Sequence, residues 1–222
     1  MKTTIKAART ALLLDADVYP VTCAKLSNGR TDLEVLDAVI EGGARMIQLR
    51  EKDLSKRDLY HLALKFREVT ARARVLFIIN DHLDIALAAE ADGVHLGQDD
   101  LPLAAARRLA PDLILGASTH SLEEALRAKH DGADYVNIGP IFPTKTKVGV
   151  DRLLGPEAIA AISPHLDIPF TVMGGINASN IDRVLENGAR RIAMVSAITM
   201  APDIAETVRA FREKIGSYSR PT

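Results

Sequence analysis

Leu76-Phe77-Ile78-Ile79-Asn80-Asp81 is a short apolar run that ends in two polar side chains. An apolar run of this length, bounded by polar residues, is typical of a β-strand that is buried on both faces. The same order of residues recurs along the chain, in Met46-Ile47-Gln48-Leu49-Arg50, Gly93-Val94-His95-Leu96-Gly97, Tyr135-Val136-Asn137-Ile138-Gly139, Phe170-Thr171-Val172-Met173-Gly174 and Ile192-Ala193-Met194-Val195-Ser196. Polar residues at the carboxyl ends of many parallel strands converge in a barrel or in an open α/β sheet, where they form one site.

Strand and helix signals alternate along the chain. Strands are predicted to begin near Val18, Arg45, Val75, Gly93, Leu113, Tyr135, Pro169 and Arg191. Apolar residues at helical spacing lie between them, at residues 33–40, 59–69, 122–128 and 181–185. Helix N-caps are predicted at Ser55 or Asp58, at Ser121 and at Ser179.

Eight strand–helix units predict an α/β fold, a single-domain (β/α)₈ TIM barrel that covers residues 18–218. Residues 1–17 are predicted to be an N-terminal extension or a short helix. An open doubly wound sheet is the alternative fold, and it is disfavoured because no Gly-x-Gly-x-x-Gly turn follows the first strand. No Pro/Gly/Ser-rich linker marks a second domain.

The composition is that of an ordinary globular protein, with no nucleic-acid or membrane signature. The 222 residues are 47% hydrophobic, and the formal net charge is −1. Asp15 and Asp17 cut the first apolar run too short for a signal peptide, and no run approaches the roughly 20 apolar residues of a membrane span. Cys23 is the only cysteine, which excludes an internal disulfide and agrees with a cytoplasmic location.

Four cationic residues follow two of the predicted strands. Arg50 and Lys52 come after the second strand, and Lys145 and Lys147 come after the sixth. A guanidinium fork suits phosphate oxygens, and an ammonium group supplies a movable point charge. Most Lys and Arg residues are solvated surface charges. The position beside strand ends nevertheless favours a ligand-binding role for Arg50, Lys52 and Lys147.

Two carboxylates follow neighbouring predicted strands, Asp81 after the third and Asp100 after the fourth. Two carboxylates, together with phosphate oxygens and water, form a shell that is typical of Mg²⁺. The pair alone is compatible with a Mg²⁺ site and with two other interpretations. Asp81 would cap the next helix, or Asp100 would be a solvated loop residue.

Small and hydroxyl-bearing residues follow the last strands. Gly174-Gly175 comes after the seventh and Val195-Ser196 after the eighth. Barrel enzymes often hold a phosphate at this place, on backbone N–H groups and a helix N-terminus. Thr144 and Thr146 add hydroxyl donors after the sixth strand. These residues indicate a second anion site, suited to a monophosphate.

Gln48 and Asn80 offer paired donor and acceptor groups with which a heterocycle could be read. His95 lies within an apolar strand and is interpreted as a hydrogen-bonded core histidine rather than a catalytic base. Two anion sites without an obvious general base indicate the displacement of a Mg-bound diphosphate by a second, phosphorylated substrate.

The motifs that carry a family resemblance are Gln48-Leu49-Arg50-Glu51-Lys52, Asn80-Asp81, His95-Leu96-Gly97-Gln98-Asp99-Asp100, Gly116-Ala117-Ser118, Gly139-Pro140-Ile141-Phe142-Pro143-Thr144-Lys145-Thr146-Lys147, Gly174-Gly175-Ile176 and Val195-Ser196-Ala197-Ile198. In this order and combination they resemble thiamine phosphate synthase, from about Val18 to the C-terminal helix. That family joins 4-amino-2-methyl-5-(diphosphooxymethyl)pyrimidine to 4-methyl-5-(2-phosphooxyethyl)thiazole. The products are thiamine phosphate and diphosphate.

The resemblance also implies roles for particular residues. It assigns the pyrimidine diphosphate to Gln48, Arg50, Lys52, Asn80, Ser118 and Lys147. The catalytic cations among them are Arg50, Lys52 and Lys147. One Mg²⁺ ion is assigned to Asp81 and Asp100. The thiazole phosphate is assigned to Thr144, Thr146, Gly175, Val195 and Ser196. The implied mechanism is dissociative: diphosphate leaves first, and the thiazole nitrogen captures the pyrimidinylmethyl cation.

Two other functions are weighed against this one, since barrels host many chemistries. A thiazole tautomerase of the same superfamily typically lacks the paired aspartates and has a histidine where this chain has Pro140. A non-catalytic barrel that binds a phosphorylated ligand would be expected to lose its metal ligands or cations. The chain departs from the family pattern at Cys23, where many members carry Asp, and at Met173, where a smaller residue is common. Small-molecule substrates are the expected partners, and a homo-oligomer is compatible with the sequence.

Overall fold

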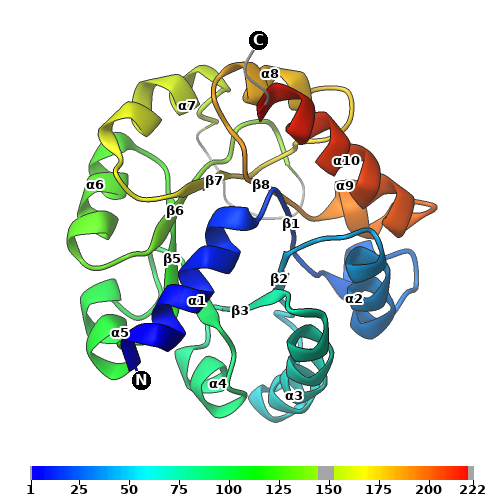
Figure 1. Ribbon diagram of the computed structural model, residues 1–222, viewed down its shortest axis with the longest axis vertical. Coiled ribbons are helices and arrows are strands. Elements are labelled where there is room, and N and C mark those ends of the chain that lie inside the picture. Colours follow the sequence, from blue (N-terminus) through cyan, green and yellow to red (C-terminus); the bar gives the residue numbers. More distant parts are fainter. Residues whose placement is uncertain (1, 145–152, 220–222) are drawn as a thin grey trace.

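The computed structural model describes residues 2–144 and 153–219 as a ring of strands surrounded by helices (Figure 1). The strands of this part of the chain are β1 (Val18–Pro20), β2 (Met46–Leu49), β3 (Leu76–Asn80), β4 (Gly93–Leu96), β5 (Ile114–Thr119), β6 (Tyr135–Ile138), β7 (Phe170–Val172) and β8 (Ile192–Met194). Each begins at the predicted residue or one residue after it, because a buried strand starts where its apolar run starts.

All neighbouring strands are parallel, in the order β1-β8-β7-β6-β5-β4-β3-β2. Val21 forms a parallel bridge with Gln48, and the Thr22 N–H donates to the Gln48 carbonyl at 3.0 Å. These contacts join β1 to β2 and close the ring. The predicted (β/α)₈ barrel is therefore confirmed, and the open-sheet alternative is wrong.

Helices follow the strands and pack around the ring. The main ones are α2 (Asp32–Glu41), α3 (Lys56–Ala73), α4 (Leu83–Ala88), α5 (Leu103–Leu109), α6 (Leu122–His130), α7 (Glu157–Ile162), α8 (Ile181–Glu186), the four-residue α9 (Ser196–Thr199) and α10 (Ile204–Ser219). Short 3₁₀ turns, η1 (Ala24–Leu26) and η2 (Ser163–His165), complete the order.

The predicted helix caps are partly confirmed. Ser55 caps α3 by accepting the Asp58 N–H, and Ser121 caps α6 by accepting the Glu124 N–H. The prediction for Ser179 is wrong. Its hydroxyl and its N–H both donate to Asn177 Oδ1, and α8 begins one residue later, after Asn180. Asn177 satisfies Ser179 within its own turn, so the serine hydroxyl is not offered to the helix.

The core has two layers. The larger lies between the outer faces of the strands and the helices. The smaller fills the inside of the barrel, and it includes Tyr19, Met46, Leu76, Ile78, Ile114, Tyr135 and Ala193. Parallel strands buried on both faces need apolar residues at successive positions. This explains why the runs in the sequence are continuous rather than alternating.

Helix α1 (Lys2–Asp15) covers the amino-terminal mouth of the barrel (Figure 1). Leu13 is fully buried and belongs to the interior cluster. Arg9 donates to the carbonyls of Ala91 and Asp112, just before β4 and β5. The opposite mouth, where the polar residues gather, is thus the one left for ligands. No helix in the described part of the chain is long and apolar enough to cross a membrane.

Candidate active site

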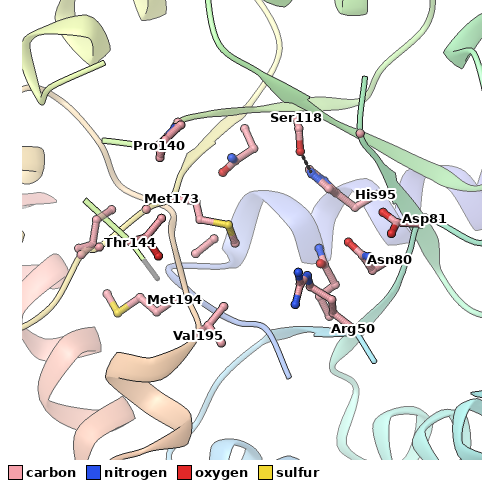
Figure 2. Close-up of a pocket in the computed structure, with 18 of the residues that line it drawn as sticks. Arg50, Asn80, Asp81, His95, Ser118, Pro140, Thr144, Met173, Met194 and Val195 are labelled. Atoms are coloured by element: carbon pink, nitrogen blue, oxygen red, sulfur yellow. Dashed lines mark hydrogen bonds between the residues drawn. The ribbon is translucent and has the colours of Figure 1, made fainter. Parts of the chain in front are cut away.

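A cavity of about 460 Å³ lies at the carboxyl ends of the strands. Loops after β2, β3, β4, β5, β6, β7 and β8 all contribute to its lining (Figure 2). The predicted site residues that line it are Gln48, Arg50, Lys52, Asn80, Asp81, Asp100, Ser118, Thr144, Gly175, Val195 and Ser196. Thr146 and Lys147, with Lys145, lie outside the described residues.

The wall formed by β2 carries Gln48 and Arg50. Gln48 is 2% exposed, and its side-chain amide donates to Tyr19 Oη at 2.7 Å. Thr22 was not predicted as a site residue, yet it holds this wall in place. Its hydroxyl accepts the Arg50 N–H at 2.9 Å, and its own N–H donates to the Gln48 carbonyl. These two hydrogen bonds to Thr22 fix the backbone that carries the Arg50 side chain.

Asp81 and Asp100 meet in the same part of the cavity. Burial raises the pKa of the Asp100 carboxyl, the Gly97 N–H lowers it, and the negative charge of Asp81 raises it again. The Gly97 N–H donates to Asp100 Oδ2 at 2.6 Å, and Lys52 Nζ lies 3.4 Å from Asp81 Oδ2. Two carboxyl groups that repel one another in a half-buried place are a ready cation site.

The capping interpretation of Asp81 is wrong. Residue 81 has φ +62°, a left-handed conformation that Asp tolerates better than most residues. Helix α4 begins after His82, and no side chain caps it. Among the residues that the structure describes, no group of three or more His, Cys, Asp or Glu side chains could hold a metal. A metal at Asp81 and Asp100 would need further ligands from a substrate or from water.

The turn after β7 forms the opposite wall. Gly174 and Gly175 have φ +109° and +61°. A Cβ on Gly175 would stand 2.3 Å from the Pro143 carbonyl oxygen, so packing against the β6 loop already demands glycine here. The Gly175 carbonyl accepts from the side-chain amides of Asn177 and Asn180 at 3.1 and 2.9 Å. Ser196 starts α9, where the first N–H groups have no partner within the helix.

His95 and Ser118 join the cavity from β4 and β5. His95 is 7% exposed, and its Nε2 lies 3.0 Å from Ser118 Oγ, the bond that is dashed in Figure 2. Its Nδ1 lies 3.0 Å from Tyr135 Oη. The interpretation of His95 as a hydrogen-bonded histidine is confirmed. Sequence reasoning did not foresee that it also lines the cavity.

The sequence had assigned no ligand to the other lining residues, apart from Gly174 in the glycine pair of the second anion site. They are Gly97, Gln98, Asp99, His120, Asn137, Gly139, Pro140, Met173, Gly174, Ile176, Ala193, Met194 and Ala197. Asn137 Oδ1 accepts from Thr171 Oγ1 at 2.9 Å, and His120 Nδ1 lies 2.6 Å from the Gly139 carbonyl. These contacts brace the strand ends. The signal in the sequence that could have revealed such a residue is a polar side chain inside an apolar run, as at Asn137.

Comparisons with known proteins show the family. The model of the family described as thiamine monophosphate synthase matches residues 18–198. The thiamine-phosphate synthase of Chloroflexus aurantiacus is 47% identical over 202 residues, which cover 91% of this chain and 94% of that protein. The thiamine-phosphate synthase of Pelotomaculum thermopropionicum is 47% identical over 201 residues, with 90% and 92% covered. A solved thiamine phosphate pyrophosphorylase from Pyrococcus furiosus has a TM-score of 0.85 at 36% identity, covering 92% of this chain and 98% of that one.

Proposed function

This chain belongs to the thiamine monophosphate synthase family, and we propose that the cavity at the carboxyl ends of its strands houses the family's reaction. The chain is a transferase that forms thiamine phosphate from small-molecule substrates. The observation that supports this placement of the reaction is that the two walls of the cavity differ in chemistry. Cations and paired carboxylates line one wall, and a glycine turn with a helix start lines the other.

The wall from β2 to β5 suits the pyrimidine diphosphate. We assign this substrate to Gln48, Arg50, Lys52, Asn80 and Ser118, with Lys147 added from the family resemblance. The buried amide of Gln48 suits the heterocycle, because a deep and nearly dry hydrogen-bonding group discriminates strongly between ring substituents. Arg50 and Lys52 lie nearer the mouth and suit the diphosphate.

The opposite wall suits the thiazole phosphate. We assign the phosphate to Thr144, Gly175, Val195 and Ser196, with Thr146 added from the family resemblance. The N–H groups at the start of α9 and the serine hydroxyl are donors, and the acidic residues of the described cavity lining, Asp81, Asp99 and Asp100, follow β3 and β4 instead. This arrangement favours an anion that brings no metal with it.

The residues present fit one Mg²⁺ ion at Asp81 and Asp100. The negative charge of Asp81 raises the pKa of the Asp100 carboxyl, and a divalent cation held by both would relieve that repulsion. Two carboxylates also leave room for diphosphate oxygens and water, as Mg²⁺ prefers. When bound, the ion supplies charge neutralisation to the diphosphate. Lys52, which lies 3.4 Å from Asp81, would share that work.

The chain's own residues support a dissociative course. Arg50 and Lys52 are positioned to stabilise negative charge on the leaving diphosphate, and that stabilisation grows as the C–O bond breaks. The pyrimidinylmethyl cation that remains is then captured by the thiazole nitrogen, which forms the new C–N bond. The ring nitrogen has no proton to lose in this step, so no general base is required. His95 is engaged on both ring nitrogens, which agrees with a role other than proton abstraction.

No observation favours the two alternatives. Pro140 lines the cavity where a tautomerase would present histidine, and the metal-ligand pair and the cations of the described residues are present. A cytoplasmic location is proposed from the single cysteine, which stays free in a reducing compartment.

The test is to incubate the purified protein with both substrates and Mg²⁺ and to detect thiamine phosphate by chromatography. We expect one thiamine phosphate and one diphosphate per turnover, and loss of turnover with excess chelator. The Arg50→Ala variant should lose at least about 100-fold in kcat/KM. Formation of thiamine phosphate at the uncatalysed rate would refute the assignment of the reaction.

A further inference from the structure

A chain of four hydrogen bonds runs through the barrel beneath the cavity. Gln48 Nε2 donates to Tyr19 Oη at 2.7 Å, and Tyr19 Oη lies 3.0 Å from Tyr135 Oη. Tyr135 Oη lies 3.0 Å from His95 Nδ1, and His95 Nε2 lies 3.0 Å from Ser118 Oγ. The chain joins strands β2, β1, β6, β4 and β5, and both of its ends line the cavity.

The middle of this chain is sealed from water. Tyr19 is 2% exposed and Tyr135 is fully buried. Burial raises the pKa of both hydroxyls, so each keeps its single proton at any working pH. Gly116 makes room for the second ring, since a Cβ there would stand 2.2 Å from the Tyr135 ring. The Gly116-Ala117-Ser118 motif thus leaves space for the Tyr135 ring and also supplies Ser118, the last residue of the hydrogen-bond chain.

Counting donors gives the chain one direction. The Gln48 amide nitrogen only donates, so the Tyr19 proton must go elsewhere, and Tyr135 Oη is the acceptor within reach among the described residues. The Tyr135 proton then goes to His95 Nδ1. A neutral imidazole that accepts on Nδ1 carries its proton on Nε2, which donates to Ser118 Oγ. Leaving any of these buried donors unused would be costly.

We propose that Tyr19, Tyr135 and His95 form a proton-ordered chain that determines which atoms Gln48 and Ser118 present to the substrate. Gln48 presents its amide oxygen, and Ser118 presents its hydroxyl proton. The pair therefore selects a ring that carries a donor at Gln48 and an anionic group at Ser118. This inference rests on the proposed function, and it specifies that a 4-amino pyrimidine is accepted and its 4-oxo counterpart rejected.

Rejection of the oxo ring follows from the cost of reversing the chain. To present its NH₂ group, Gln48 would have to rotate its amide so that the oxygen faces Tyr19. Both tyrosine protons and the histidine tautomer would then have to change together, or a buried donor would lose its acceptor. Tyr19, Tyr135 and His95 are thus positioning residues, which act through Gln48 and Ser118.

The first test is made on the free protein, without substrate, and needs one variant only to assign the histidine signals. In protein labelled with ¹⁵N-histidine at pH 8, the His95 signals should be those of the neutral Nε2–H tautomer. The His95→Gln spectrum identifies which signals belong to that residue. An Nδ1–H tautomer or an imidazolium at position 95 would overturn the proposal, because either one requires the opposite direction or a break in the chain.

The second test compares the amino- and oxo-pyrimidinylmethyl diphosphates by calorimetry. Unaltered protein should prefer the amino ring by at least about 100-fold. Tyr135→Phe removes one hydroxyl from the middle of the chain and should reduce that preference about tenfold, mainly by weakening the amino ligand. Tyr60→Phe, a tyrosine of α3 outside the cavity lining, is the matched control and should change nothing.

An unchanged preference in Tyr135→Phe, in a variant whose amide spectrum is that of a folded protein, would overturn the proposal. Failure of the proposed function has a different outcome: unaltered protein would bind neither diphosphate. The histidine tautomer would still decide whether the chain is ordered, since that measurement uses the free protein.

Discussion

Two aspartates flank strand β4 in the sequence, Asp92 directly before it and Asp100 four residues after it, and their surroundings are opposite. Asp92, just before the strand, is 2.9 Å from Arg67 and 3.3 Å from Arg9, and it accepts the Phe77 N–H at 3.0 Å. Asp100, just after the strand, has the carboxyl group of Asp81 as a neighbour. One carboxylate is satisfied by the protein, and the other is left in need of a cation.

The same contrast holds for other strands. Before β6, Asp134 pairs with Lys6 and Arg107 and accepts the Leu115 N–H, and before β1, Asp17 pairs with Arg212. Beyond the carboxyl ends, Asp32 lies against Glu51 as Asp81 lies against Asp100. The amino end of the barrel thus uses charge for stability, and the carboxyl end keeps charge available for ligands.

The largest effect is expected at the carboxyl end. Asp100→Asn and Asp81→Asn should each lower kcat/KM for thiamine phosphate formation by at least about 100-fold, because the cation site loses a charged ligand while Asn keeps the left-handed backbone of residue 81. The melting temperature should be unchanged or higher, since the repulsion between the two carboxyls is removed. Activity assays measure the change in kcat/KM, and thermal melts of the same variants measure the change in melting temperature. A large drop in stability would show that Asp100 is a structural residue like Asp92.

The reverse result is expected at the amino end. Asp92→Ala leaves two arginines and one buried N–H without their shared acceptor, and should cost about 3 kcal/mol of unfolding free energy. Turnover per folded molecule should stay within about twofold, because the change is remote from the cavity. Denaturant unfolding measures the first quantity, and kcat at a temperature below the transition measures the second. A selective loss of kcat would contradict the division between the two ends.

A smaller effect is expected at Asp32, a buried carboxyl at the start of α2. Burial and, after it, the neighbouring Glu51 carboxyl raise its pKa to about 7, while Oδ1 has no hydrogen-bond partner among the described residues. Between pH 4 and 7 the folded state holds a proton that the unfolded state has lost, so stability falls as the pH rises.

Asp32→Asn should remove this dependence. We expect the variant to match the unaltered protein near pH 4 and to exceed it by about 1–2 kcal/mol at pH 8, a value reduced from the full shift because a helix N-terminus favours the carboxylate. Urea unfolding at the two pH values, with Asp37→Asn on the same helix as the control, gives the difference. A gain that is equal at both pH values would rule out titration of Asp32 as its cause.

Local patterns in the sequence were sufficient to predict the barrel. A continuous apolar run, as in residues 76–79, predicts each buried strand, and the polar residues that follow the run predict where the cavity lies. Contacts between distant strands could not be predicted in this way. Tyr19 and Tyr135 are separated by 116 residues, and each is read as an ordinary aromatic core residue until the strands are closed into a ring. Gly175 was predicted to bind a phosphate, and the second reason for glycine there, the Pro143 carbonyl oxygen 2.3 Å from any added Cβ, could not be predicted because it joins two loops far apart in the sequence.

Helix α1 has a consequence for the route by which substrates enter and products leave. Helix α1 lies across the amino-terminal mouth of the barrel (Figure 1), and Leu13 packs into the interior, so the cavity of the described residues opens at the carboxyl ends of the strands. Both substrates must arrive, and both products must leave, through the same mouth. We therefore expect the departure of diphosphate to precede the arrival of the next pyrimidine, so that product release as well as bond breaking contributes to the turnover rate.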